Sequence, residues 1–164
     1  MDMDEYQAQQ TPLQAELRDV VLQGNPNVMA TFEFRADVTR EFAVKCFGRM
    51  VHKLKRHYFG RNSRKRIMMV PVVEGLEYGK RIHIHCLIAF PGNPLDHLAL
   101  VRELWMESSK LCGDPAEYCP DSLEWFLVLG TEEKQRAFAN YCMKTCAKDH
   151  YAVLWDYVPR WLTK

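Results

Sequence analysis

The sequence predicts an α+β fold, in which a central antiparallel sheet of four or five strands carries helices packed against it. Three observations lead to this class. Residues 27–37 alternate between apolar and other side chains, as a strand does, whereas residues 39–60 repeat apolar side chains every four positions, as a helix does. Two further strand-like segments, 66–75 and 80–90, are joined by a short turn, which makes them an antiparallel hairpin.

The chain of 164 residues suits a single domain, spanning 1–164, with one sizeable core. About the first ten residues are acidic and polar, and we expect them to be disordered. Because this start is unlike a signal peptide, we expect an intracellular protein. No stretch approaches the roughly 20 apolar residues of a membrane span, so we expect no membrane partner.

The six cysteines are expected to be free thiols in a reducing compartment. None of them forms a CxxC pair, and the spacings of the last four would be unusual for a zinc site. They are Cys46, Cys86, Cys112, Cys119, Cys142 and Cys146.

The first helix is expected at residues 11–24, where Thr11 can cap the start and Gly24 can end it. The strand at 27–37 is predicted to be half-buried, with Met29, Thr31, Glu33 and Arg35 on the face opposite to Val28, Ala30, Phe32 and Phe34.

The long helix at 39–60 begins after Thr39 and ends at Gly60. Its predicted core face consists of Phe42, Cys46, Met50, Leu54 and Tyr58. After the hairpin, the sequence predicts a helix at 94–111 capped by Asn93, a loop at 113–122, a strand at 123–130, a helix at 131–148, and a short strand and turn in 150–164.

Two histidines interrupt the apolar strand 80–90. Residues two apart on a strand share a face, so His83 and His85 lie together, opposite to Ile84 and the rest of the predicted core face. Two imidazoles on one face can bind one divalent metal ion through their ring nitrogens. The alternative is a pair of hydrogen-bonded structural histidines.

The hairpin adds a carboxylate to this face. A turn centred between Tyr78 and Gly79 pairs Glu74 with His83, and directly opposed side chains lie about 5 Å apart at Cβ. Glu74 is therefore the predicted third ligand, while Glu77 points to the other face and is the reserve if the turn changes by one residue. Three protein ligands leave coordination positions open, which is typical of a catalytic site.

Tyr141 lies outside the apolar arc of the helix at 131–148. On a helical wheel it clusters with Lys144 and Lys148, whereas Phe138 and Cys142 lie on the apolar side. A phenol near ammonium groups suits a nucleophile that attacks an anionic phosphate. The alternative is a surface tyrosine with its ring against the protein.

A run of cations without any acid extends from residue 49 to residue 66, which indicates a surface for a polyanion. The alternative is a solvated helix face. The residues expected to contact this polyanion are Arg49, Lys53, Arg56, Arg61, Arg64, Lys65 and Arg66 from this run, together with Lys148.

These motifs together resemble the HUH endonuclease superfamily, in its one-tyrosine replication-initiator form, over about residues 27–150. The quoted motifs are the strand ATFEF, the HIH of His83 to His85 with Glu74 upstream, and the YCMK of Tyr141 to Lys144. Thr145 occupies the place where a two-tyrosine member would carry its second tyrosine.

The resemblance implies a ferredoxin-like sheet and a site-specific single-stranded DNA endonuclease that nicks and rejoins its substrate to initiate rolling-circle replication of a plasmid, phage or related element. It implies that Glu74, His83 and His85 hold Mg²⁺ or Mn²⁺, that Tyr141 forms a 5′-phosphotyrosine link, and that Lys144 positions the phosphate. Single-stranded or hairpin origin DNA would be the partner, with a helicase or host replication proteins in trans. The compartment would be the cytoplasm for a prokaryotic or phage element and the nucleus for a eukaryotic one.

Three alternatives remain open. A single-strand DNA transposase would use the same chemistry, although such enzymes tend to carry Gln where Lys144 stands. A non-haem iron enzyme could use two histidines and one carboxylate. A non-enzymatic nucleic-acid-binding domain would leave His83 and His85 with a structural role.

Overall fold

The structure is a computed structural model that describes residues 12–77, 79–110, 125–148 and 152–162. The side chains of residues 13 and 145–148 are also outside the description. Several expectations therefore fall outside the described residues: the disordered start, the Thr11 cap, the loop at 113–122, and any zinc site that needs Cys112 and Cys119.

Four strands form one antiparallel sheet in the order β2-β3-β1-β4. The strands are β1 (Val28–Glu33), β2 (Met68–Glu74), β3 (His83–Ala89) and β4 (Phe126–Val128). A helix connects β1 to β2 and another connects β3 to β4, which gives the β-α-β-β-α-β order of ferredoxin-like folds. The predicted α+β class and antiparallel sheet are confirmed.

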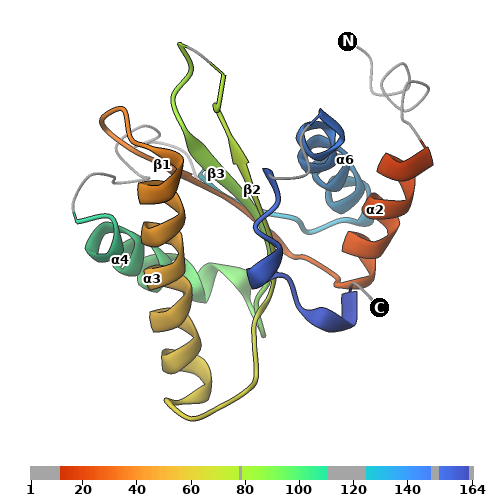
Figure 1. Ribbon diagram of the computed structural model, residues 1–164. Coiled ribbons are helices and arrows are strands. Elements are labelled where there is room, and N and C mark those ends of the chain that lie inside the picture. The colour runs from red at the N-terminus through yellow and green to blue at the C-terminus, as the bar shows by residue number, and fades with distance from the viewer. Residues whose placement is uncertain (1–11, 78, 111–124, 149–151, 163–164) are drawn as a thin grey trace.

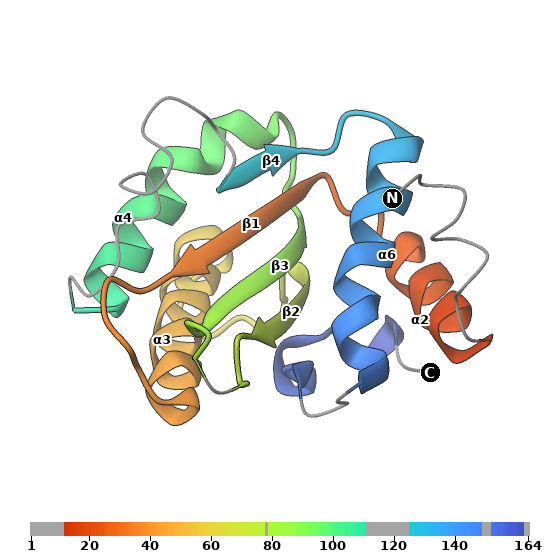
Figure 2. The same cartoon turned by 90° about the horizontal axis from the view of Figure 1, so that it is seen from above.

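Helices cover both faces of the sheet (Figures 1 and 2). On one face lie α3 (Arg40–Phe59) and α4 (Leu98–Ser108), and on the other lie α2 (Pro12–Gln23) and α6 (Glu132–Lys148). The sheet therefore separates two apolar cores, one beneath α3 and α4 and one beneath α2 and α6.

The prediction that β1 is half-buried is wrong for its first half. Val28 and Ala30 belong to the core beneath α3, as expected, but Met29 is also buried, in the core beneath α6. Only towards the end of β1 do Thr31 and Glu33 become partly exposed. The second face is thus apolar at one end of the sheet and open at the other.

Helix α3 forms as the sequence predicts. The Thr39 side chain accepts a hydrogen bond from the Phe42 N–H, and the chain leaves the helix at Gly60, whose φ of 81° suits glycine. Within the predicted core face, Cys46, Met50 and Leu54 are fully buried. The helix after Asn93 begins as a 3-10 turn, η1 (Pro94–His97), before α4.

The C-terminal segment covers the outer edge of β2. Val153 forms a bridge with Val72, and the Leu154 N–H donates to the Pro71 carbonyl at 3.0 Å. Two 3-10 turns follow, η3 (Trp155–Tyr157) and η4 (Arg160–Leu162). The predicted strand in this region is therefore a single bridge, which protects an otherwise open edge.

No described helix combines the length and the apolar character needed to cross a membrane.

Candidate metal centre

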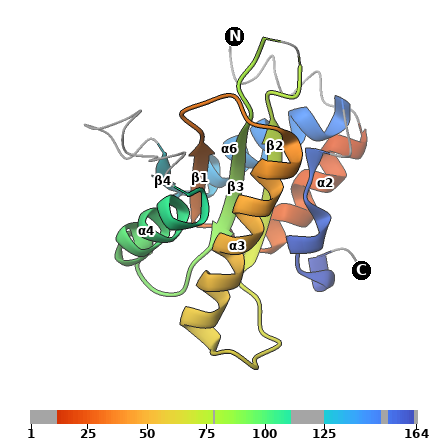
Figure 3. The same cartoon turned by 60° about the vertical axis from the view of Figure 1, so that its left-hand side comes forward.

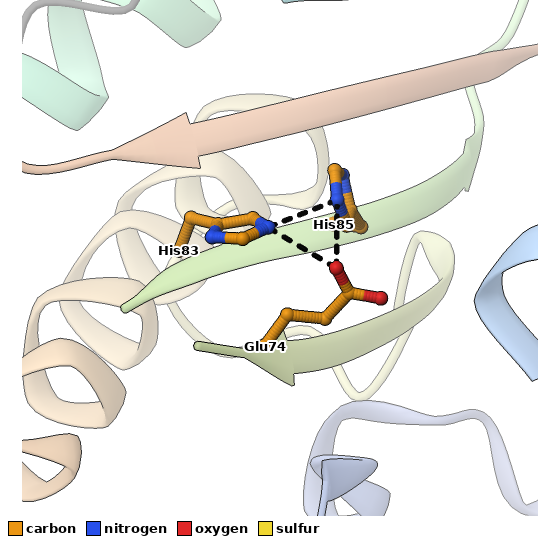
Figure 4. Close-up of side chains that lie close together, drawn as sticks. All are labelled: Glu74, His83 and His85. Carbon is orange, nitrogen blue, oxygen red and sulfur yellow. Dashed lines mark hydrogen bonds and ion pairs between the residues drawn. The ribbon is translucent and has the colours of Figure 1, made fainter. Parts of the chain in front are cut away.

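The β2–β3 hairpin brings a carboxylate and two imidazoles together at one end of the sheet. Glu74 ends β2 and pairs with His83, which begins β3, and His85 lies two residues further on the same face (Figure 4). The predicted register is confirmed, although the connection spans residues 75–82 rather than two turn residues. Its centre is unchanged, so the parity that selects Glu74 is kept.

The three donor atoms form a nearly equilateral triangle. The Glu74 Oε2 lies 3.2 Å from the His83 Nε2 and 3.3 Å from the His85 Nε2, and the two nitrogens are 3.2 Å apart. Donors bound to one divalent ion at about 2.0–2.1 Å are about 2.8–3.0 Å apart in octahedral sites and about 3.3–3.4 Å apart in tetrahedral sites. The cluster could therefore hold a metal ion, as its single-atom donors all lie within 4.8 Å of one another.

A main-chain carbonyl fixes the tautomer of His83. The His83 Nδ1 lies 3.1 Å from the Arg81 carbonyl oxygen, which can only accept a hydrogen bond. Nδ1 therefore carries the hydrogen, and in the neutral ring the lone pair is on Nε2, the atom that faces Glu74 and His85. This is the arrangement that orients a histidine as a metal ligand.

His85 is oriented from the neighbouring strand. Thr31 on β1 pairs with His85 on β3, and its Oγ1 lies 2.9 Å from the His85 Nδ1. A Nδ1–H that donates to this hydroxyl leaves the His85 Nε2 free to coordinate. The His85 side chain is also buried, with 8% of its surface exposed, so few other orientations are open to it.

Glu74 controls the charge of His83 in the absence of a metal ion. Burial of the ring acts to lower the pKa of His83, but hydrogen bonds to Glu74 and to the Arg81 carbonyl outweigh burial. The pKa of His83 is therefore raised above its ordinary value. A proton on His83 is thus the natural competitor of a metal ion at this site.

Gly75 allows the Arg81 carbonyl to reach this position. Its φ is 80°, and a Cβ on Gly75 would lie 1.9 Å from the Arg81 oxygen. Only glycine tolerates both conditions. The residue that follows Glu74 therefore also permits the hydrogen bond that orients His83.

Tyr141 lies over the cluster from α6. Its ring packs edge-on against His85, with centroids 5.3 Å apart, and 46% of its surface is exposed, as expected for a residue outside the apolar arc. Tyr141 and Lys144 line one pocket of about 400 Å³ together with Glu74 and His83. The structure thus brings the tyrosine and one of the two lysines together with the candidate metal cluster of Glu74, His83 and His85.

The phenol is not activated by its protein surroundings alone. Burial, followed by the nearby charge of Glu74, raises the pKa of Tyr141 above its usual value. Nearby lysines alone would act to lower the pKa of a phenol, but burial, with a smaller contribution from the Glu74 charge, acts in the opposite direction. The side chain of Lys148 lies outside the described residues.

Glu77, the reserve ligand, is not part of the cluster. Its carboxylate forms an exposed ion pair with Lys80 at 2.7 Å. Among the described residues, the only grouping of three potential ligands found is Glu74, His83 and His85.

The basic stretch lies at the other end of the sheet. Arg66 comes just before Met68, which pairs with Ala89 at the end of the β2–β3 ladder opposite to Glu74 and His83. The end of this stretch therefore lies away from Glu74, His83 and His85, because α3 runs away from that end of the sheet. Residues Arg56, Arg61, Arg64 and Lys65 are exposed there, together with Arg66.

An acid from another element neutralises part of this stretch. Lys53 pairs with Glu107 of α4 at 2.6 Å, and Arg49 contacts the Ser108 carbonyl at 3.5 Å. The run contains no acidic residue in the sequence, but in the folded chain an acidic residue of α4 lies beside it.

The described cysteines are the free thiols that the sequence predicts, and Cys46, Cys86 and Cys142 are all buried. The Cys142 thiol contacts the Met29 sulfur at 3.7 Å, inside the core beneath α6.

Two positioning residues, Thr31 and Gly75, were not predicted. Thr31 has the correct parity on its strand, but its pairing with His85 depends on a long-range register. Gly75 carried a signal, since a glycine directly after a strand often marks a close backbone approach.

Comparison with known protein families, with curated proteins and with solved structures found no match.

Proposed function

We propose that this chain is a metal-dependent endonuclease and strand transferase of the HUH type, which nicks and rejoins single-stranded DNA through a tyrosine. The observation that carries this proposal is the packing of Tyr141 against His85, one of three residues whose donor atoms converge on a point. A candidate nucleophile and a candidate metal site thus share one pocket.

Glu74, His83 and His85 would hold Mg²⁺ or Mn²⁺ in this proposal. The bound ion would supply Lewis acidity towards a phosphate oxygen and positive charge close to the phenol. The tautomer of His83 and the donor separations support a divalent ion here. Two imidazole donors favour Mn²⁺ over Mg²⁺, because Mg²⁺ prefers oxygen ligands.

Tyr141 would act as the nucleophile. Its Oη would form a bond to phosphorus while the bond from phosphorus to the 3′ oxygen breaks, and the DNA 5′ end would remain on the tyrosine. The phenol proton would leave to solvent, and the departing 3′ oxygen would take up a proton. A 3′ hydroxyl attacking the phosphotyrosine would reverse these steps and rejoin a strand, because the covalent link conserves the phosphodiester energy.

Lys144 would bind the phosphate from the same side as Tyr141. It projects one helical turn further along α6 and lines the same pocket. Its presence favours a replication initiator over a single-strand transposase, which tends to carry glutamine at this position.

The test is covalent capture of labelled single-stranded DNA, read on a denaturing gel. With Mn²⁺ we expect a protein–DNA adduct that is absent with chelator and absent in Tyr141→Phe. Tyr157→Phe is the matched control, since that ring packs against Phe47 of α3, and it should form the adduct normally.

An adduct that persists in Tyr141→Phe would remove the nucleophile from the proposal. DNA binding without any adduct, unaffected by chelator or by His83→Ala, would instead identify a non-enzymatic binding domain.

A further inference from the structure

A groove of about 730 Å³ lies between the C-terminal end of α3, the segment that follows it, and the η4 turn. Figure 3 shows these segments away from the β2–β3 connection, at the opposite end of the molecule. The residues of the groove that matter here are Lys55, Arg64, Lys65, Arg66, Arg160 and Trp161.

The lining of this groove carries positive charge only. Five of its residues are lysines or arginines, and none of its described lining residues is acidic. The Arg66 guanidinium donates to the main-chain carbonyl of Asp156 at 2.9 Å, which orients the side chain without neutralising it. Such a groove attracts the phosphates of a nucleic acid.

Trp161 is the most exposed large apolar side chain of the described residues, with 59% of its surface accessible. The turn that carries it is anchored, because the Leu162 side chain is buried in the core beneath α2 and α6 and the Leu162 N–H donates to the Pro159 carbonyl at 3.0 Å. An indole ring held at the surface beside cations is a platform on which an unpaired base can stack.

We propose that this groove is a second binding site for single-stranded nucleic acid, in which cations hold the phosphates and Trp161 stacks on a base. A single strand is favoured over a duplex because base faces are accessible only when bases are unpaired. The inference does not depend on the cleavage chemistry, since the site shares no residue with the metal cluster.

The two sites are separated along the length of the β2–β3 ladder. Seven residue pairs, from Met68 with Ala89 to Glu74 with His83, correspond to about 20 Å of strand. One strand that occupies both sites must span this distance. Longer oligonucleotides should therefore bind more tightly than short ones, because the second contact becomes intramolecular.

The experiment is fluorescence anisotropy with labelled oligothymidine of about 15 nucleotides, in chelator, with Tyr141→Phe as the parent protein so that cleavage cannot contribute. Trp161→Ala should weaken binding about tenfold, in line with the loss of one stacked base. Trp161→Phe should retain most of the affinity.

The matched control is Trp155→Ala, which removes another exposed tryptophan (44% accessible) from the same segment but outside the groove. For charge, Arg64→Glu should weaken binding, while Lys134→Glu, an exposed cation on α6, should change it little. Thermal unfolding of each variant verifies that the fold is retained.

The proposal would be overturned if Trp161→Ala and Arg64→Glu bound oligothymidine like their controls. It would equally be overturned if Trp161→Ala weakened binding to a blunt duplex as much as binding to the single strand. None of these outcomes bears on the covalent adduct at Tyr141, so the two proposals fail separately.

Discussion

His83 and His85 of the candidate metal site are held by different kinds of hydrogen-bond partner. His83 donates to the main-chain carbonyl of Arg81, which no side-chain substitution at that position removes. His85 is held by the hydroxyl of Thr31, which a single substitution can delete. The orientation of His85 can therefore be tested without changing any ligand.

Thr31→Val should lower the affinity for Mn²⁺ by about tenfold or more, because hydrogen-bond partners of ligands typically contribute 10–100-fold. Calorimetric titration measures the affinity, and Thr31→Ser is the matched control that keeps the hydroxyl. Equal affinity in Thr31→Val and the unmodified chain would show that the hydroxyl does not orient His85.

Metal affinity should depend on pH through His83. The metal-free protein has a raised pKa at His83, so its protonated form is stabilised, and a metal ion must displace that proton. Affinity for Mn²⁺ should therefore rise with pH and level off only above pH 6.5, the ordinary pKa of histidine. Titrations at several pH values test this.

The cause of this shift can be checked separately by NMR titration of His83 in the metal-free protein. Glu74→Gln should lower the pKa, since the carboxylate is the leading upward influence. The sign for stability follows the same rule: the His83–Glu74 pair stabilises the metal-free fold at low pH, and this contribution is lost as pH rises through the raised pKa. An unchanged pKa in Glu74→Gln would contradict this assignment.

At the scale of elements, the hairpin could be predicted because its register depends on local information. Strand parity places His83 and His85 on one face, and the centre of the turn then selects Glu74. The ends of the strands were not predicted, since the hydrophobic pattern extends to residues 75 and 80 whereas the ladder ends at Glu74 and His83.

Contacts between elements that are distant in sequence could not be predicted. The helical wheel correctly placed Tyr141 off the apolar face, but only packing of α6 over the sheet brings it against His85. The pairing of Thr31 with His85 likewise requires the β1–β3 register.

Gly75→Ala tests the close approach at the end of β2. The added Cβ would meet the Arg81 oxygen, so the carbonyl that orients His83 must move. We expect weaker Mn²⁺ binding and a loss of stability larger than the roughly 1–2 kcal/mol cost of a left-handed backbone.

Gly79→Ala is a matched control, because Gly79 has the same φ of 80° and a Cβ added there would meet nothing within 4 Å. It should carry the backbone cost alone and bind Mn²⁺ normally. If both variants bind the ion equally, contact with Arg81 is not what matters.

At the scale of the whole molecule, the metal cluster lies outside both cores. The apolar residues beneath α3 and beneath α6 supply the burial that stabilises the fold, and Glu74 and His83 belong to neither. The fold should therefore not require the ion.

Chelation should leave the protein folded. Its free energy of unfolding should fall only by the stabilisation that ion binding supplies, which is about 2.7 kcal/mol when the ion is at 100 times its dissociation constant. The melting temperature should fall accordingly. Phe32→Ala, which empties a fully buried position, should cost about 3–5 kcal/mol with or without the ion. Thermal unfolding in chelator measures both. Loss of cooperative unfolding in chelator would mean that the ion is structural.

The position of the basic run on the folded molecule could not be predicted from the sequence. A run of cations in the chain predicts a surface for a polyanion, but its position relative to the metal cluster depends on the direction of α3. Because α3 runs from the end of β1 towards the start of β2, the run ends far from Glu74 and His83.

The connection at residues 75–82 projects beyond the sheet, and the ladders on both sides of β3 fix the register without it (Figure 1). Past Gly75 and before Arg81, its length can change while the ligands stay in place. We therefore expect that this connection can be replaced by other sequences without loss of the fold. Leu76, Glu77 and Lys80 of this connection line the pocket, so under the function proposed above we expect libraries that vary them to change substrate preference while Glu74, His83 and His85 stay in place.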